Sequence, residues 1–170
     1  MNILYLSFYF EPDLCAGSFR NSPLAKELSK QAGNNSVIEV VTSQPNRYNT
    51  FKVKAEARET IGNMTIHRIQ LPEHKSGMLE ITKNRKYDLV FASSSRLFTA
   101  YLGCVIARKQ RIPLYLDIRD IFVDTMEDVL KNRWLKTAVM PFLKLVERRT
   151  FGYAHHINLI SEGFKPYFAK

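Results

Sequence analysis

Cysteine is scarce in this chain: Cys15 and Cys104 are the only two among 170 residues. Two thiols cannot build a disulfide framework or the ligand set of a structural zinc site, and so low a number is typical of a reducing cytosolic compartment. No uninterrupted apolar run approaches the roughly 20 residues that a membrane-spanning helix needs. No basic segment followed by an apolar signal core opens the sequence. We therefore expect a cytoplasmic protein that is either soluble or peripherally attached to a membrane.

Several functional motifs are missing as well. The first apolar segment is not followed by G-x-G-x-x-G, which argues against a dinucleotide cofactor and against a nucleotide-dependent oxidoreductase. The G-x-S-x-G of the α/β-hydrolases is absent too. The four histidines lack the H-x-x-x-H and H-E-x-x-H spacings, so we expect neither a metal nor a cofactor. Basic and aromatic residues do not interleave as they do in single-strand binders, and we expect no nucleic-acid partner.

The charge that is present has one dominant sign. The formal net charge is +9, which by itself indicates an anionic partner: a nucleic acid, a phosphorylated ligand or a membrane surface. Many of the cations fall in residues 131–149, where Glu147 is the single acid. This stretch predicts a basic amphipathic helix of the kind that lies at a membrane interface, with an ordinary surface helix packed on a sheet as the alternative. Its basic residues are Lys131, Arg133, Lys136, Lys144, Arg148 and Arg149, and its aromatic ones are Trp134 and Phe142.

Short continuous apolar runs alternate with helical patterns along the chain. Strands buried on both faces belong to a parallel sheet covered by helices. One helix is expected from Ser22-Pro23 to Ala32, with Gly33 as its C-cap, and another from Leu97 to Lys109. The sequence thus predicts a three-layer, Rossmann-like α/β domain over residues 1–170 with a mainly parallel sheet. The predicted strands are Ile3–Phe8, Val37–Thr42, Leu89–Ser93, Leu114–Ile118 and Ile157–Ile160.

One segment interrupts this alternation. Residues 53–71 hold a Gly62-Asn63 turn between two extended stretches, which predicts a β-hairpin insertion. The following polar residues, 72–86, give no clear element.

Ionised residues lie at the end of one predicted strand. Asp117 is inside the strand Leu114–Ile118, and Arg119 and Asp120 directly follow it. Burying such groups without partners costs several kcal/mol each. In an open parallel sheet, ligands bind outside the carboxyl ends of the strands. The cluster is therefore either part of a ligand site or a structural ion pair of Arg119 with Asp117 or Asp120.

A second polar segment follows the first predicted strand. There Gly17 and Ser18 precede a helix, and a glycine at this turn lets backbone amides face an anion. The simpler interpretation is that Gly17 only permits the turn.

Two further strand exits carry polar residues. After the third predicted strand come Ser94, Ser95 and Arg96, where one serine is expected to cap the next helix and the others are placed to bind a sugar or phosphate. After the last strand, Ser161 is expected to be a cap and Glu162 a first-turn acid.

Taken in order, several segments resemble the N-terminal domain of family 4 glycosyltransferases, the retaining enzymes of the GT-B fold. The Gly-Ser-x-Arg and D-x-R-D pieces are most similar to the subgroup that transfers amino sugars such as N-acetyl-fucosamine in O-antigen or capsule synthesis. The family's glycine pair is a single Gly17 here, and the histidine found after the fifth strand in many members has no counterpart. The similar segments are Met1–Pro12, Gly17–Arg20, Leu24–Leu28, Val41–Tyr48, Tyr87–Val90, Asp117–Asp120, Glu147 and Ile160–Glu162.

The resemblance implies a nucleotide-diphospho-sugar donor and a polyprenyl-linked saccharide acceptor at the inner face of the plasma membrane. Gly17 and Ser18 would lie near the donor phosphates, with Arg20 as an additional anion contact. A complete enzyme of this family has a second, donor-binding domain with an E-x7-E motif, which this chain lacks, so we expect the chain alone to be inactive. The alternative function is a non-catalytic module that recruits a partner or a membrane. The residues placed at the catalytic cleft are Asp117, Arg119 and Asp120.

Overall fold

The computed structural model describes residues 1–48, 50, 53–70, 77–94, 96–130 and 132–168. The strands are β1 (Asn2–Leu6), β2 (Val37–Ser43), β3 (Arg58–Ile61), β4 (Met64–Ile69), β5 (Leu89–Ser93), β6 (Leu114–Ile118) and β7 (His156–Leu159). The helices are α1 (Ala16–Ala32), α2 (Gly77–Thr82), α3 (Leu97–Gln110), α4 (Phe122–Val129), α5 (Arg133–Phe151) and α6 (Lys165–Phe168), with a 3₁₀ turn η1 (Glu162–Phe164).

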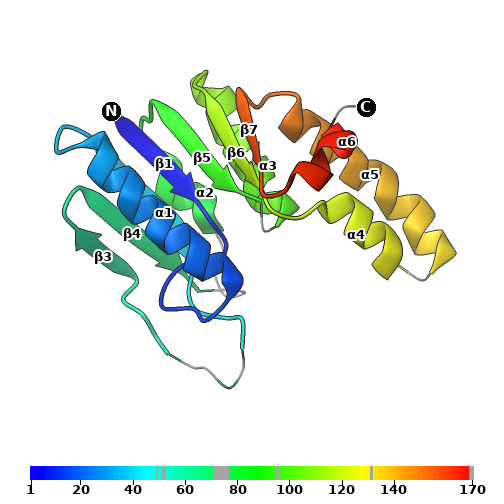
Figure 1. Ribbon diagram of the computed structural model, residues 1–170, viewed down its shortest axis with the longest axis horizontal. Coiled ribbons are helices and arrows are strands. Elements are labelled where there is room, and N and C mark those ends of the chain that lie inside the picture. Colours follow the sequence, from blue (N-terminus) through cyan, green and yellow to red (C-terminus); the bar gives the residue numbers. More distant parts are fainter. Residues whose placement is uncertain (49, 51–52, 71–76, 95, 131, 169–170) are drawn as a thin grey trace.

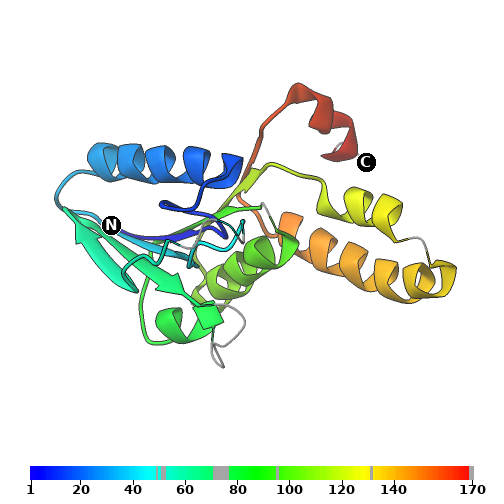
Figure 2. The ribbon, with the colours of Figure 1, turned by 90° about the horizontal axis from the view of Figure 1, so that it is seen from below.

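The strands form one sheet in the order β3-β4-β2-β1-β5-β6-β7. All neighbours are parallel except β3 and β4, which form an antiparallel pair. Helix α1 lies on one face of the sheet, and α2 and α3 lie on the other (Figure 2). The predicted three-layer α/β fold with a mainly parallel sheet and a hairpin is therefore confirmed.

An aromatic row crosses four parallel strands on the α1 face of the sheet. The rings of Tyr5 and Phe91 stack with centroids 4.6 Å apart, those of Phe91 and Tyr115 at 5.1 Å, and those of Tyr115 and His156 at 4.5 Å. Side chains of one face recur at every second strand residue, so register alone brings these rings into line. The row ends in exposed His156 on the edge strand β7.

Two local predictions need correction. Helix α1 begins at Ala16, six residues before the predicted Ser22-Pro23 start, and Pro23 lies inside it. The earlier turns are held by tertiary packing, because the face that includes Gly17, Ser18 and Asn21 is buried. Residues 77–82, in the stretch without a predicted element, form the short helix α2.

The hairpin is tied to the end of α1. The Gly62-Asn63 turn joins β3 to β4 as predicted, with Gly62 in the left-handed region at φ 58°. The Asn63 side-chain amide donates to the carbonyl of Gly33 at 2.9 Å and to that of Ser29 at 3.2 Å. Gly33 is the C-cap of α1, also as predicted.

A buried carboxylate joins β2 to β4 and to the loop before β5. Glu39 is only 4% exposed, and it accepts a hydrogen bond from the Tyr87 hydroxyl at 2.5 Å and pairs with Arg85. His67 Nε2 lies 2.6 Å from Glu39 Oε1 in a contact that is not aligned for a hydrogen bond. Burial lowers the pKa of His67 below its ordinary value, against the raising effect of the Glu39 carboxylate.

Stability is therefore expected to fall with acidification through His67. A histidine whose pKa is lowered by folding stays neutral in the native state while the unfolded chain takes up a proton. Its contribution is present above the unfolded pKa of about 6.5 and is lost as the pH falls below that value. Urea unfolding followed by circular dichroism at about pH 7.5 and about pH 5.5 should show a smaller pH-dependent loss for His67→Gln. Equal losses in the two proteins would contradict the assignment.

Candidate functional site

The carboxyl ends of β1, β5 and β6 meet at one edge of the sheet, beside the first turn of α1 (Figure 1). We call this region the carboxyl-edge site and define it by Tyr9, Gly17, Arg96, Asp117 and Arg119. These residues come from three separate parts of the chain, each at the end of a different strand, as expected from the parallel strand order.

A polar row crosses the sheet at this edge, two positions beyond the aromatic row and therefore on the same face. Ser93 pairs in register with Asp117, and Asp117 with Asn158. Ser7, which directly follows β1, extends the row beside Ser93. The hydroxyls of Ser7 and Ser93 are buried and have no hydrogen-bond partner within the described part of the chain. Buried polar groups are rarely left unsatisfied, and at a sheet edge they indicate a place for water or for ligand atoms.

Asp117 is the charged centre of this row and is 1% exposed. Arg20 of α1 donates two hydrogen bonds to its carboxylate, from Nη2 at 2.8 Å and from Nε at 3.2 Å. The Asn158 amide donates to the same carboxylate at 2.6 Å. The hydrogen bond to Asp117 raises the pKa of Arg20 above its ordinary value. A structural ion pair was one of the two predicted interpretations of this cluster. The predicted partner of Asp117 was wrong, because Asp117 pairs with Arg20 and not with Arg119.

Arg119 instead contacts the first turn of α1. Its Nη1 lies 3.4 Å from the Gly17 carbonyl oxygen and its Nη2 3.3 Å from that of Ala16. Its backbone N–H donates to the Ser94 hydroxyl at 3.4 Å. The Nε atom is buried and finds no acceptor among the described residues. No described carboxylate forms an ion pair with Arg119, so its positive charge is uncompensated at this edge.

Gly17 is required by a close approach of Tyr9. A Cβ at position 17 would lie 2.9 Å from Tyr9 Cδ2 and 3.0 Å from Tyr9 Cβ. Gly17 therefore lies within the first turn of α1 and not in a turn before it, while the predicted contact of this backbone with an anion stays a prediction. Ser18 beside it is 1% exposed. The first turn of α1 contains no acid, so its unpaired N–H groups keep their positive character.

Arg96 approaches the same segment from α3. Its guanidinium lies 4.2 Å from the centre of the Phe8 ring and donates to the Tyr9 hydroxyl at 3.1 Å. Arg96 is itself the N-cap of α3, and its side chain makes no capping hydrogen bond. The predicted serine cap of this helix is therefore not found: Ser94 binds Arg119 instead, and Ser95 lies outside the described residues.

The remaining predicted site residues lie apart from these contacts. Asp120 is exposed, and its carboxylate makes no hydrogen bond to a described residue. Ser161 caps the η1 turn as predicted, accepting from the Gly163 N–H at 3.2 Å. Glu162 is 89% exposed at its side chain and pairs with Lys165 at 2.8 Å.

Sequence reasoning missed several members of the site. Ser7 and Asn158 join it through strand register, and counting in twos from the aromatic residues could have found them. No pattern in the sequence indicated that Tyr9 belongs to the site.

An open cavity of about 240 Å³ adjoins Arg96 and is otherwise mainly apolar. Its lining includes Phe8, Met78, Arg96, Phe98, Leu102 and Phe122.

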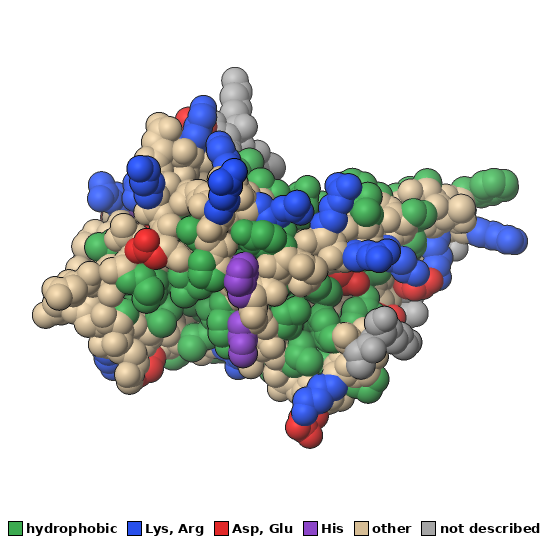
Figure 3. Space-filling view, turned by 90° about the horizontal axis from the view of Figure 1, so that it is seen from above, with side chains coloured by type: hydrophobic (Ala, Val, Ile, Leu, Met, Phe, Trp, Pro, Cys, Tyr) green, Lys and Arg blue, Asp and Glu red, His purple; other side chains and the backbone are tan. Residues whose placement is uncertain are grey.

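Helix α5 presents a second feature, an outer face of apolar and basic side chains. Its inner residues Met140, Leu143 and Val146 pack against α3 and α4. Trp134 is 86% exposed and Phe142 is 56% exposed, so both aromatics point to solvent. Basic and hydrophobic side chains lie together at this end of the molecule (Figure 3). We call Arg133, Trp134, Leu135, Lys136, Phe142, Lys144, Leu145, Arg148 and Arg149 the α5 outer face, while Lys131 lies outside the described residues.

The charges of the α5 outer face are partly offset by one acid of α4. Lys136 and Lys144 lie 3.7 Å and 3.6 Å from the carboxylate of Glu127. These pairs are partly exposed and contribute little to stability. None of the described helices is long and apolar enough to cross a membrane.

Among the described residues, no group of three histidine, cysteine or acidic side chains is arranged to hold a metal ion. The chain matches no protein-family model and no curated protein. Membership of a glycosyltransferase family therefore stays a prediction. The two features of the structure that bear on function are the carboxyl-edge site and the α5 outer face.

Proposed function

We propose that this chain is the acceptor-binding half of a retaining glycosyltransferase that takes a nucleotide-diphospho-sugar as donor and a lipid-linked saccharide as acceptor in surface polysaccharide synthesis. The class of reaction comes from the sequence resemblance. The observation that supports it most is the pair of guanidinium groups, Arg96 and Arg119, without described carboxylate partners at the carboxyl-edge site. Both contact the segment from Tyr9 to Gly17, Arg96 at the Tyr9 hydroxyl and Arg119 at the carbonyls of the first turn of α1.

The two arginines suit a diphosphate. Guanidinium groups bind phosphate oxygens strongly, and the acid-free first turn of α1 adds positive potential. In this proposal they neutralise charge on the departing nucleoside diphosphate, and the work of the protein is positioning and electrostatic stabilisation. Asp117 is a positioning residue, because its carboxylate already accepts hydrogen bonds from Arg20 and Asn158. Asp120 is the accessible acid of the D-x-R-D stretch and the one available to an acceptor.

The acceptor side of the proposal rests on two apolar surfaces. The cavity beside Arg96 has aromatic and aliphatic walls, which suit the hydrocarbon chain of a lipid-linked acceptor. The α5 outer face would hold the chain on an anionic membrane, where such an acceptor resides. The competing function, a non-catalytic module that recruits a membrane or partner, needs only the α5 outer face and is favoured by the exposure of Trp134.

Titration of the isotope-labelled chain with uridine diphosphate, followed by NMR, tests the proposal. The backbone amides of Gly17, Ser18 and Arg119 are expected to shift. Replacing Arg96 and Arg119 together by glutamine should weaken binding by about tenfold or more, because two charge-assisted contacts are lost.

Arg108→Gln serves as the matched control, since Arg108 lies in the last turn of α3, away from the carboxyl-edge site. Uridine without phosphates should bind far more weakly than the diphosphate. Absence of shifts at the carboxyl-edge site, together with membrane binding by the α5 outer face, would favour the non-catalytic module.

A further inference from the structure

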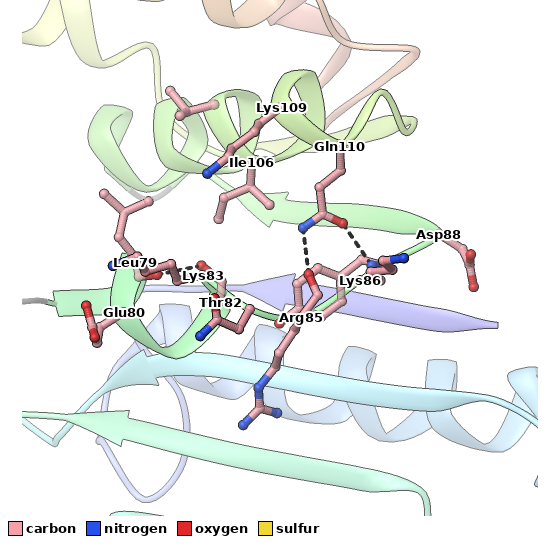
Figure 4. A pocket seen from close by; sticks show the side chains of 13 residues that line it. Leu79, Glu80, Thr82, Lys83, Arg85, Lys86, Asp88, Ile106, Lys109 and Gln110 are labelled. Carbon is pink, nitrogen blue, oxygen red and sulfur yellow. Dashed lines mark hydrogen bonds between the residues drawn. The ribbon is translucent and has the colours of Figure 1, made fainter.

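A large cavity lies at the opposite ends of the strands from the carboxyl-edge site. It has a volume of about 820 Å³ and is formed by α2, the loop before β5 and the C-terminal half of α3 (Figure 4). Tyr87 and Asp88 directly precede β5, which places the cavity at the amino ends of the strands. It shares no residue with the carboxyl-edge site, and its size falls within the range of about 300–1,000 Å³ typical of small-molecule sites.

Hydrogen bonds hold the frame of this cavity in place. Gln110 of α3 accepts from the Tyr87 N–H and donates to the Arg85 carbonyl, both at 2.9 Å (Figure 4). The Tyr87 hydroxyl and the Arg85 guanidinium in turn bind buried Glu39. The loop is thus fastened to α3 on one side and to β2 on the other. A wall fixed in this way loses little conformational freedom when a ligand binds.

The polar lining carries more positive than negative charge. Arg85 is committed to Glu39, and the Asp88 carboxylate accepts from the Asn2 N–H at 2.7 Å. Three lysines of the lining, Lys83, Lys86 and Lys109, form no ion pair with any residue that the structure describes. The one other acid of the lining, Glu80, is exposed on α2, as the three lysines also are in their segments. The cavity therefore offers ammonium groups to an anion.

Part of the wall is apolar. Leu79 of α2 faces Ile106 of α3 across the cavity, and Lys109 reaches over Ile106 toward α2 (Figure 4). Val105 of α3 also lines the cavity. An inorganic anion would leave these hydrocarbon surfaces exposed, and a neutral apolar molecule would leave the lysines without a partner. A ligand with an apolar body and one anionic group satisfies both parts of the lining.

We propose that this cavity is a binding site for a small amphipathic anion, a phosphate or carboxylate carried on an aromatic or aliphatic body. The lysines contact the anionic group, and Leu79, Val105 and Ile106 contact the body. The site is independent of the proposed glycosyltransferase function, because it uses none of the residues assigned to the donor or the acceptor.

NMR titration of the labelled chain with 1-naphthyl phosphate tests this site. The backbone amides of residues 79–88 and 105–110 should shift, and those of the carboxyl-edge site should not. Replacing Lys83 and Lys109 together by alanine should weaken binding at least tenfold. Inorganic phosphate and neutral 1-naphthol, each carrying half of the ligand's chemistry, should both bind at least tenfold more weakly than 1-naphthyl phosphate.

Lys136→Ala combined with Lys144→Ala is the matched control, because it removes the same charge from the α5 outer face. Retained far-ultraviolet circular dichroism shows that each variant is folded. Equal binding of 1-naphthol, equal binding by the Lys83 and Lys109 variant, or shifts confined to the carboxyl-edge site would each overturn the proposal. The diphosphate and naphthyl phosphate titrations report on different amides, so failure of one is separable from failure of the other.

Discussion

Replacing Asp117 by alanine is expected to lower the free energy of unfolding by about 2–4 kcal/mol. Removing one member of a buried ion pair usually costs about 3–5 kcal/mol, because the partner is left uncompensated. Here Arg20 is 35% exposed at its side chain and regains some hydration, which lowers the expected cost. The Asn158 amide also loses its acceptor. Urea denaturation followed by far-ultraviolet circular dichroism measures the change.

Asp120→Ala is the matched control, three residues further along the same chain segment. Its carboxylate is exposed, so the expected change is within about 0.5 kcal/mol. The pair of variants separates the two acids by role: Asp117 organises the site, and Asp120 is accessible to a ligand. Similar stabilities for Asp117→Ala and the wild type would show that the contact with Arg20 does not stabilise the fold.

Binding to anionic vesicles is expected to depend on the α5 outer face. Each lysine or arginine near an anionic leaflet contributes about 1 kcal/mol, and the contribution falls off within a Debye length. Reversing Lys136 and Lys144 to glutamate should therefore weaken vesicle binding by at least about 30-fold, as measured by co-sedimentation. Added salt should weaken it as well. Glu127→Gln should strengthen binding, because this acid offsets both lysines.

The same charge reversal on α1 controls for net charge. Lys26→Glu combined with Lys30→Glu changes the total by the same amount on a helix at the other face of the sheet. If this variant loses binding equally, the attraction comes from overall charge and not from the α5 outer face. Equal binding of the wild type to neutral and anionic vesicles, or binding to neither, would contradict the prediction.

The fold was predictable because burial on both faces leaves a direct mark on the sequence. Strands such as β1 and β6 include short apolar runs, Ile3–Leu6 and Leu114–Leu116, and the Gly62-Asn63 turn marks the hairpin. The start of α1 was not predictable from such marks. Pro23 is favourable at a first helical turn, yet packing of the preceding turns beside Tyr9 extends the helix to Ala16.

The site was predictable in place but not in its contacts. Parallel topology sends every strand exit to the same edge, so Asp117 and Arg119 were expected there. The partner of Asp117 lies 97 positions away in Arg20, and no local pattern encodes that distance. The cavity between α2 and α3 could not be predicted from any sequence motif. Its two walls come from segments that look like ordinary helix surfaces in the sequence.

Trp134 is the only tryptophan of the chain and stands on the α5 outer face. Its indole is already surrounded by water in the native state, so its fluorescence emission should change little when the protein unfolds. Transfer of the ring into a bilayer would shift that emission to shorter wavelength. The protein thus carries a single tryptophan whose emission should hardly respond to unfolding and would report any contact between α5 and a lipid surface.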